Sequence, residues 1–199
     1  MATLQRSMAS GSKFEDQVIT VVRKYSRALW RNVRIETLLT QNGTTEMDIL
    51  FCLQDVVFIL EAKNVSSIMG NYDSKNWAFI GSTSPTRETR EYTHLNTITQ
   101  NNIHVRSFKD LFYSEYQEWP AVVACIVVPN GCRLSPELTG SIYTLSQLDS
   151  LLARVAECDS NAKVQRRVAA LILGDGVTVQ RRDFYTDQRT GIRMKGGSG

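Results

Sequence analysis

Two short apolar runs that are separated by only two polar residues constrain the fold of this chain more than any other feature. The runs span residues 49–53 and 56–60, consist mainly of Val, Ile, Leu and Phe, and meet at Gln54-Asp55. Runs of this length and composition are typical of β-strands, and a two-residue connection would fold them into a hairpin. Neither Gln54 nor Asp55 is a favoured residue for such a turn, so the prediction depends on the apolar pattern.

The register of this hairpin brings ionisable residues together at its open end. If Gln54 and Asp55 form the turn, residues equidistant from it face one another, which places Asp48 opposite Glu61. Because side chains alternate between the two faces of a strand, Asp48, Glu61 and Lys63 share one face. Most other positions on both faces are apolar, so the hairpin is expected in the middle of a domain.

Two carboxylates on an apolar sheet repel each other and resist the loss of water unless a positive charge lies between them. A divalent cation would supply that charge, and oxygen ligands without nearby Cys or His suit Mg²⁺ or Mn²⁺ better than Zn²⁺. Lys63 could then orient an attacking water or neutralise a phosphate, as in metal-assisted phosphodiester hydrolysis. A buried ion pair of Lys63 with Asp48 or Glu61 that serves only the fold explains the spacing equally well.

Four segments of the chain form a known pattern. They are Asp48 followed by Glu61-Ala62-Lys63, Gly11-x-x-x-Glu15, Glu61-Ala62-Lys63-Asn64 followed by Gly70 and Trp77, and Asn96-x-x-x-Gln100-Asn101 followed by His104. Over residues 11–130 the chain thereby resembles the nuclease-related domain (NERD) family, a branch of the PD-(D/E)xK nuclease superfamily. The resemblance implies an α/β, restriction-endonuclease-like fold, in which helices flank a mixed β-sheet. It also implies a divalent-metal-dependent nuclease that cuts DNA rather than RNA.

The resemblance also implies which residues hold the metal. Asp48, Glu61 and the carbonyl of Ala62 are the expected ligands of Mg²⁺ or Mn²⁺, and Glu15 is the expected ancillary ligand. Lys63 is expected to join Asp48 and Glu61 as a catalytic residue. A plainer interpretation of Glu15 is that a carboxylate at the start of a helix is favoured by the helix dipole.

Further polar residues are expected to contact the nucleic acid. Gln100 is similar to the glutamine of the Q-x-x-x-Y element of RecB-like nucleases, which implies a catalytic and nucleic-acid-binding role, although His104 stands where that element has tyrosine. Asn64, Lys75 and Arg87 are candidate contacts of the phosphate backbone. Turn formation explains Asn64 equally well, and ordinary solvated charges explain the other two. The pattern does not require a general base, and a lone histidine is more often structural.

Apolar periodicity and turn residues predict the remaining elements. Helices are expected over residues 13–29, 93–116 and 145–157, and a last helix between a cap at Asp159-Ser160 and Gly174. Strands are expected over residues 30–39, 77–80, 121–128 and 141–144, and a polar loop over 81–90. Thr144 and Gln147 are spaced as a capping box.

The length of 199 residues favours one domain. Residues 1–12 are predicted as a flexible arm, 13–174 as a single nuclease domain that includes the C-terminal helices, and 175–199 as a basic, flexible tail. The formal net charge of +3 permits contact with nucleic acid without requiring it. No run reaches the roughly 18 apolar residues of a membrane span. The N-terminus lacks the apolar core of a signal peptide, and the four cysteines lack C-x-x-C spacing, so free thiols in the cytoplasm are expected.

Two other function classes remain open at this point. One is a catalytically silent, nuclease-derived module that binds nucleic acid or protein; the complete set of Asp48, Glu61 and Lys63 favours an active nuclease over it. The other is a structural α/β domain in which these charges form a closed ion-pair network. The chain carries no helicase, kinase or zinc module to deliver substrate, so a homo-oligomer or a partner chain is expected to do so.

Overall fold

The computed structural model describes residues 13–82, 89–159, 162–174 and 177–179. The strands of the larger sheet are β1 (Leu29–Glu36), β2 (Thr44–Leu53), β3 (Val56–Ala62), β7 (Ala121–Val128), β9 (Ile142–Thr144) and β10 (Val177–Val179). Those of the smaller sheet are β4 (Ser67–Met69), β5 (Asn76–Ser82), β6 (Thr89–Leu95) and β8 (Arg133–Leu134). The helices are residues 13–22, α2 (Thr97–Tyr116), α3 (Leu145–Ala156), α4 (Lys163–Ile172) and the short 3₁₀ turn Pro136–Leu138.

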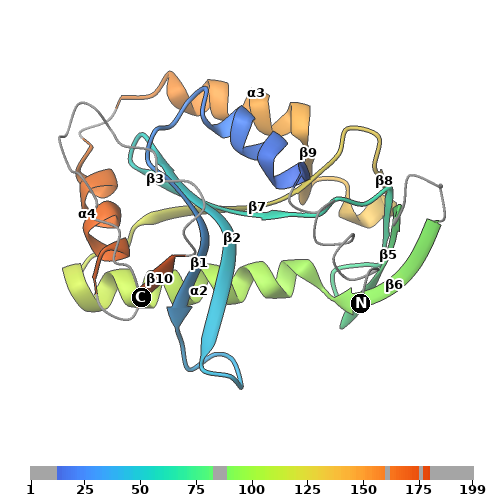
Figure 1. The fold of residues 1–199 in the computed structure, drawn as a ribbon, viewed down its shortest axis with the longest axis horizontal. Coiled ribbons are helices and arrows are strands. Elements are labelled where there is room, and N and C mark those ends of the chain that lie inside the picture. The colour runs from blue at the N-terminus through green and yellow to red at the C-terminus, as the bar shows by residue number, and fades with distance from the viewer. Residues whose placement is uncertain (1–12, 83–88, 160–161, 175–176, 180–199) are drawn as a thin grey trace.

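The larger sheet is mixed and has helices on both faces, so the predicted α/β class is confirmed (Figure 1). Its strand order is β10-β1-β2-β3-β7-β9, with β3, β7 and β9 parallel to one another and the other neighbours antiparallel. The helix of residues 13–22 and α3 cover one face, and α2 runs along the other with α4 beside its C-terminal end.

The central hairpin has the predicted register, from Leu53↔Val56 at the turn to Ile49↔Leu60. Gln54 takes the left-handed backbone conformation at φ 55°. Its side-chain amide donates to the Ala156 carbonyl at 2.8 Å, which ties the turn to the end of α3. This long-range contact explains how a turn without Asn or Gly is held in a conformation that those residues favour.

The two faces of the hairpin enter two separate apolar clusters. Ile49, Phe51, Phe58 and Leu60 pack against the helix of residues 13–22 and α3. Leu50, Cys52, Val57 and Ile59 pack instead against Phe108 and Phe112 of α2 and against α4. Asp48 and Glu61 therefore continue the row of side chains that faces α2.

Two of the predicted helix boundaries are wrong because residues that were expected at the helix ends pair in strands instead. The first helix stops at residue 22, and Leu29 instead starts β1 by pairing with Phe51. The helical spacing of Tyr25 and Leu29 suggested a longer helix because both residues pack against the same apolar cluster as the helix itself. Residues 93–95 are strand β6 rather than the start of α2, since Thr93 pairs with Ala78 of β5.

The smaller sheet, order β6-β5-β4-β8, is absent from the predicted elements apart from residues 77–80, which lie within β5. β6 occupies the end of the predicted polar loop, and residues 83–88 lie outside the described residues. Gly70 comes close to Trp77 here: a Cβ at Gly70 would lie 2.4 Å from the indole Cδ1. The Gly70 and Trp77 positions of the family pattern thus have a packing role in this chain.

The predicted capping box is present. The Thr144 side chain accepts from the backbone N–H of Gln147, and the Gln147 side chain accepts from the backbone N–H of Thr144. The last helix starts at Lys163, later than predicted, because Ala162 takes a left-handed conformation at φ 56°. Residues 177–179 pair with β1 as strand β10, so the sheet extends past the predicted domain boundary at residue 174. Residues 1–12 and 180–199 lie outside the described residues.

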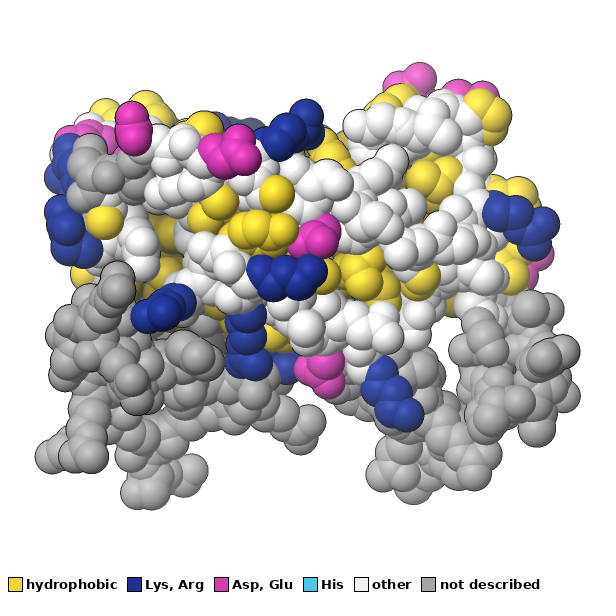
Figure 2. Space-filling view, turned by 90° about the horizontal axis from the view of Figure 1, so that it is seen from above, with side chains coloured by type: hydrophobic (Ala, Val, Ile, Leu, Met, Phe, Trp, Pro, Cys, Tyr) yellow, Lys and Arg dark blue, Asp and Glu magenta, His cyan; other side chains and the backbone are white. Residues whose placement is uncertain are grey.

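Charges of both signs are interspersed on the face formed by α3 and the N-terminal helix (Figure 2). An example is the ion pair of Lys24 with Asp149 at 3.1 Å. The described part of this face therefore does not present one large basic area. Within the described ranges, no helix is both long and apolar enough to cross a membrane. Cys52 and Cys125 are buried free thiols, and Cys132 and Cys158 are free as well.

Candidate active site

The open end of the β2–β3 hairpin and the first turns of α2 together form a cluster of ionisable residues. Asp48 is half-buried on β2, and its Oδ2 accepts a hydrogen bond from the Ala62 backbone N–H at 3.0 Å. Glu61, on β3, is only 2% exposed. Lys63 follows β3, and its backbone N–H donates to the Val127 carbonyl of β7 at 2.9 Å, which fixes where its side chain starts.

The Glu61 carboxylate is held unequally at its two oxygens. Oε1 accepts from Lys63 Nζ at 2.6 Å and from Gln100 Nε2 at 3.1 Å. Oε2 is buried without a hydrogen-bond partner among the described residues, and His104 Nδ1 lies 3.9 Å from it. A buried carboxylate oxygen without a donor costs free energy unless something positive reaches it.

Electrostatic effects within the cluster are strong. Burial, together with the negative charges of Glu61 and Glu15, raises the pKa of Asp48 to about 7, although Lys63 and the Ala62 N–H oppose the shift. Burial also disfavours the charged form of Lys63, but attraction to Glu61 and Asp48 outweighs it, so the pKa of Lys63 is raised. Lys63 therefore stays protonated at neutral pH, whereas Asp48 is poised to bind either a proton or a cation.

The donor set fits a hard divalent cation in part. Asp48 and the unpartnered Oε2 of Glu61 supply oxygen atoms of the kind that Mg²⁺ and Mn²⁺ prefer. Glu15, the expected ancillary ligand, is instead bound to Arg31, with its Oε2 3.1 Å from Arg31 Nη2. No group of three His, Cys, Asp or Glu side chains in the described part of the chain is arranged to hold a metal. Asp48 and Glu61 would thus be the main protein ligands, completed by the Ala62 carbonyl and water.

The structure separates the predicted nucleic-acid contacts. Gln100 lies in the cluster, where it binds Glu61. Asn64 is exposed directly after Lys63, and its carbonyl lies near Gly81 of β5. Lys75 is exposed at the start of the second sheet, where its carbonyl accepts from the Asn96 N–H at 3.0 Å. Arg87 lies outside the described residues.

Two further residues lie beside the cluster, of which the sequence analysis interpreted His104 as structural and missed Tyr92. His104 lies one turn after Gln100 on α2, is 2% exposed, and has its pKa lowered by burial against the opposing effect of Glu61. Its spacing from Gln100 was the available signal. Tyr92 of β6 lies near enough to Lys63 for their charges to interact, and its ring stacks on Phe79 at 5.5 Å. β6 was predicted partly as the end of a loop and partly as the start of a helix, so no pattern pointed to Tyr92.

Asn96, the first residue of the last family segment, anchors α2. Its Oδ1 caps the helix by accepting from the N–H groups of Ile98 and Thr99. Its Nδ2 donates to the carbonyls of Tyr72 and Ser74, each at 2.9 Å. Asn96 thereby fixes the end of the helix that carries Gln100.

Comparison with known proteins identifies the family of the chain. A family model described as nuclease-related domain (NERD) matches residues 10–129, more than half of the chain. The matched span contains the hairpin, the smaller sheet up to β6, α2 and β7. No match was found among curated proteins or among solved structures. The chain therefore belongs to the nuclease-related domain family.

Proposed function

We propose that the protein is a divalent-metal-dependent nuclease that hydrolyses phosphodiester bonds, in DNA rather than RNA, with Mg²⁺ or Mn²⁺ as cofactor. The observation that supports this best is the buried Glu61 carboxylate, which has Lys63 on one oxygen and no donor on the other. Family membership supports a nuclease-related function. The preference for DNA rests on the resemblance to the PD-(D/E)xK superfamily.

In this proposal Asp48, Glu61 and the Ala62 carbonyl would hold the metal. A bound Mg²⁺ would polarise the phosphate and increase the acidity of a bound water. Lys63, which is charged and 21% exposed, would orient the attacking water and stabilise negative charge on the phosphate. Gln100 would keep the Glu61 carboxylate in place through its hydrogen bond to Oε1. The water oxygen would bond to phosphorus as the bond between phosphorus and the leaving sugar oxygen breaks. The water would lose one proton, and the leaving sugar oxygen would gain one.

A cleavage panel tests the proposal. Supercoiled DNA, linear DNA and single-stranded RNA would be incubated with the protein in Mg²⁺, Mn²⁺ or EDTA. We expect metal-dependent cutting of DNA that falls by about 10²–10³-fold in Asp48→Asn and in Lys63→Ala, as for the loss of one electrostatic contributor. Lys24→Ala, which removes an exposed lysine paired with Asp149, is the matched control and should cut like wild type. Folded wild type that cuts no substrate with either metal would refute the proposal.

A silent nuclease-derived binding module is the second candidate, and specific contacts favour it. Lys63 already neutralises Glu61 at 2.6 Å, and Arg31 already neutralises Glu15. These pairs leave less unmet negative charge for a cation than a site with free carboxylates would. The panel separates the two candidates, since wild type and Lys63→Ala would be equally inactive if the protein were a silent module.

A further inference from the structure

Two exposed aromatic side chains lie in a row on β6, the outermost strand of the smaller sheet. Tyr92 is 43% exposed, and His94 is exposed as well. Both rings contact the buried Phe79 of β5: the Tyr92 ring is stacked on it at 5.5 Å between centroids, and the His94 ring lies edge-on at 6.4 Å. The two rings therefore share one face of the sheet, whereas Glu91 and Thr93 point to the other face.

The row begins beside the candidate active site, and Gly81 of β5 marks the meeting point. A Cβ at Gly81 would lie 3.6 Å from Cε1 of Tyr92 and 3.9 Å from the carbonyl oxygen of Asn64. Asn64 directly follows Lys63, and the charges of Tyr92 and Lys63 lie near enough to interact. The Tyr92 ring thus lies next to the lysine that would stabilise charge on the phosphate.

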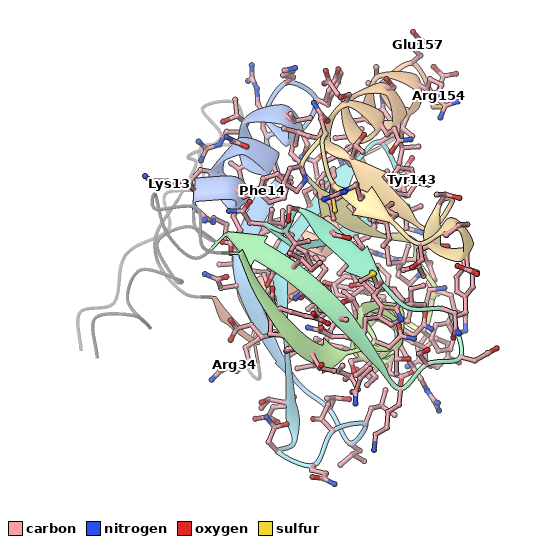
Figure 3. All side chains as sticks on the ribbon, turned by 90° about the vertical axis from the view of Figure 1, so that its right-hand side faces the viewer. Lys13, Phe14, Arg34, Tyr143, Arg154 and Glu157 are labelled. Carbon is pink, nitrogen blue, oxygen red and sulfur yellow. The ribbon has the colours of Figure 1, made fainter. Side chains whose placement is uncertain are left out.

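From Lys63 the row continues along β6. Side chains two positions apart on a strand are separated by about 7 Å, so His94 extends the row by that distance beyond Tyr92. The exposed Lys75 lies just before β5, beside the last residue of β6. Figure 3 views the molecule from this side, on which Figure 1 places β5 and β6. Aromatic rings on a sheet, with cations nearby, are the groups on which proteins stack the bases of single strands.

We propose that Tyr92 and His94 stack two successive bases of single-stranded DNA, which extends from the candidate active site along β6. An unpaired strand exposes the faces of its bases, and stacking on aromatic rings tolerates any base. In a duplex each base is covered by its neighbours, so rings that are fixed on a sheet cannot reach its faces. This inference rests on the proposed nuclease function and names its substrate as single-stranded, although the binding is measurable without cleavage.

Fluorescence anisotropy of labelled oligonucleotides in EDTA, at one fixed salt concentration, measures binding by the full chain without cleavage. The probes are single-stranded oligo(dT) and the oligo(dA)·oligo(dT) duplex of the same length. We expect wild type to bind the single strand at least about fivefold more tightly than the duplex. Tyr92→Leu and His94→Leu should each weaken single-strand binding by at least about fivefold, as for the loss of one stacked base, and leave duplex binding unchanged.

Two further variants separate stacking from a role in the fold. Tyr92→Phe keeps the ring and should bind like wild type, whereas Tyr92→Leu keeps only an apolar side chain beside Phe79. Tyr113→Leu is the matched control, because it removes another exposed, stacked ring, on α2, and should bind both probes like wild type.

The outcomes distinguish this inference from the proposed nuclease. Single-strand affinity no higher than duplex affinity, or single-strand affinity that Tyr92→Leu or His94→Leu leaves unchanged, overturns the stacking proposal even if the protein cuts DNA. An equal loss of affinity for both probes in Tyr92→Leu also overturns it. Single-strand binding that depends on both rings, in a protein that cuts no substrate, upholds the stacking proposal and refutes the nuclease.

Discussion

The burial of Asp48 should make the stability of the fold depend on pH, and Asp48→Asn should remove that dependence. Burial and the neighbouring Glu61 raise the pKa of Asp48 from 3.8 to about 7. Between about pH 4 and pH 7 the folded state therefore holds a proton that the unfolded chain has lost, so the free energy of unfolding falls as pH rises through this window. About three pKa units at about 1.4 kcal/mol each set an upper limit of about 4 kcal/mol on this loss.

Asn at position 48 retains an oxygen that can accept from the Ala62 N–H, but carries no charge to desolvate. In urea titrations at pH 8, the free energy of unfolding of Asp48→Asn should exceed that of wild type by up to about 4 kcal/mol. The two proteins should converge near pH 4. Asp73→Asn, at an exposed aspartate, should follow the wild-type curve. If wild type and Asp48→Asn gave parallel curves from pH 4 to pH 8, the argument that burial destabilises the Asp48 carboxylate would be refuted.

Two packing predictions concern the framework of the site. Gly70→Ala should lower the free energy of unfolding by at least about 2 kcal/mol, because its Cβ would overlap the fully buried Trp77 indole. Gly131→Ala is the matched control, since nothing lies within 4 Å of its added Cβ, and an equal loss in both variants would contradict the packing argument. Phe58→Ala should cost about 3–5 kcal/mol in urea unfolding, because Phe58 is fully buried and stacks on Phe51 at 4.9 Å. A cost below about 1 kcal/mol would show that the hairpin is not central to the core.

The hairpin and its register were predictable because period-two alternation and two apolar faces leave few alternatives. The same logic placed Asp48, Glu61 and Lys63 on one face, and the contacts of Glu61 with Lys63 and Gln100 agree with it. β6, β4, β8 and β10 were missed because they are either very short or, as in β6, mostly polar. Exposed residues such as Tyr92 carry no apolar pattern that reports strand pairing.

Long-range ion pairs and cavities were also beyond the sequence. From the sequence, Glu15 can be interpreted as a helix-start carboxylate, a metal ligand or an ion-pair partner. Only the structure, in which Arg31 on β1 lies beside it, identifies the ion pair. The absence of a hydrogen-bond partner for the buried Oδ1 of Asn101 depends on how α2 packs on the sheet, which no local sequence pattern reports. His104 was visible as a neighbour of Gln100, but its burial near Glu61 follows from the packing of α2 on the sheet.

The central claim is that Asp48 and Glu61 form a divalent-metal site, and anomalous diffraction from crystals grown with Mn²⁺ tests it most directly. The account predicts an anomalous peak in contact with Asp48 and with Oε2 of Glu61, while Lys63 remains close to the Glu61 carboxylate. Crystals of Glu61→Gln grown in the same way should lack the peak. Wild-type crystals in millimolar Mn²⁺ that show no peak at these carboxylates, with the Lys63–Glu61 pair unchanged, would contradict the account.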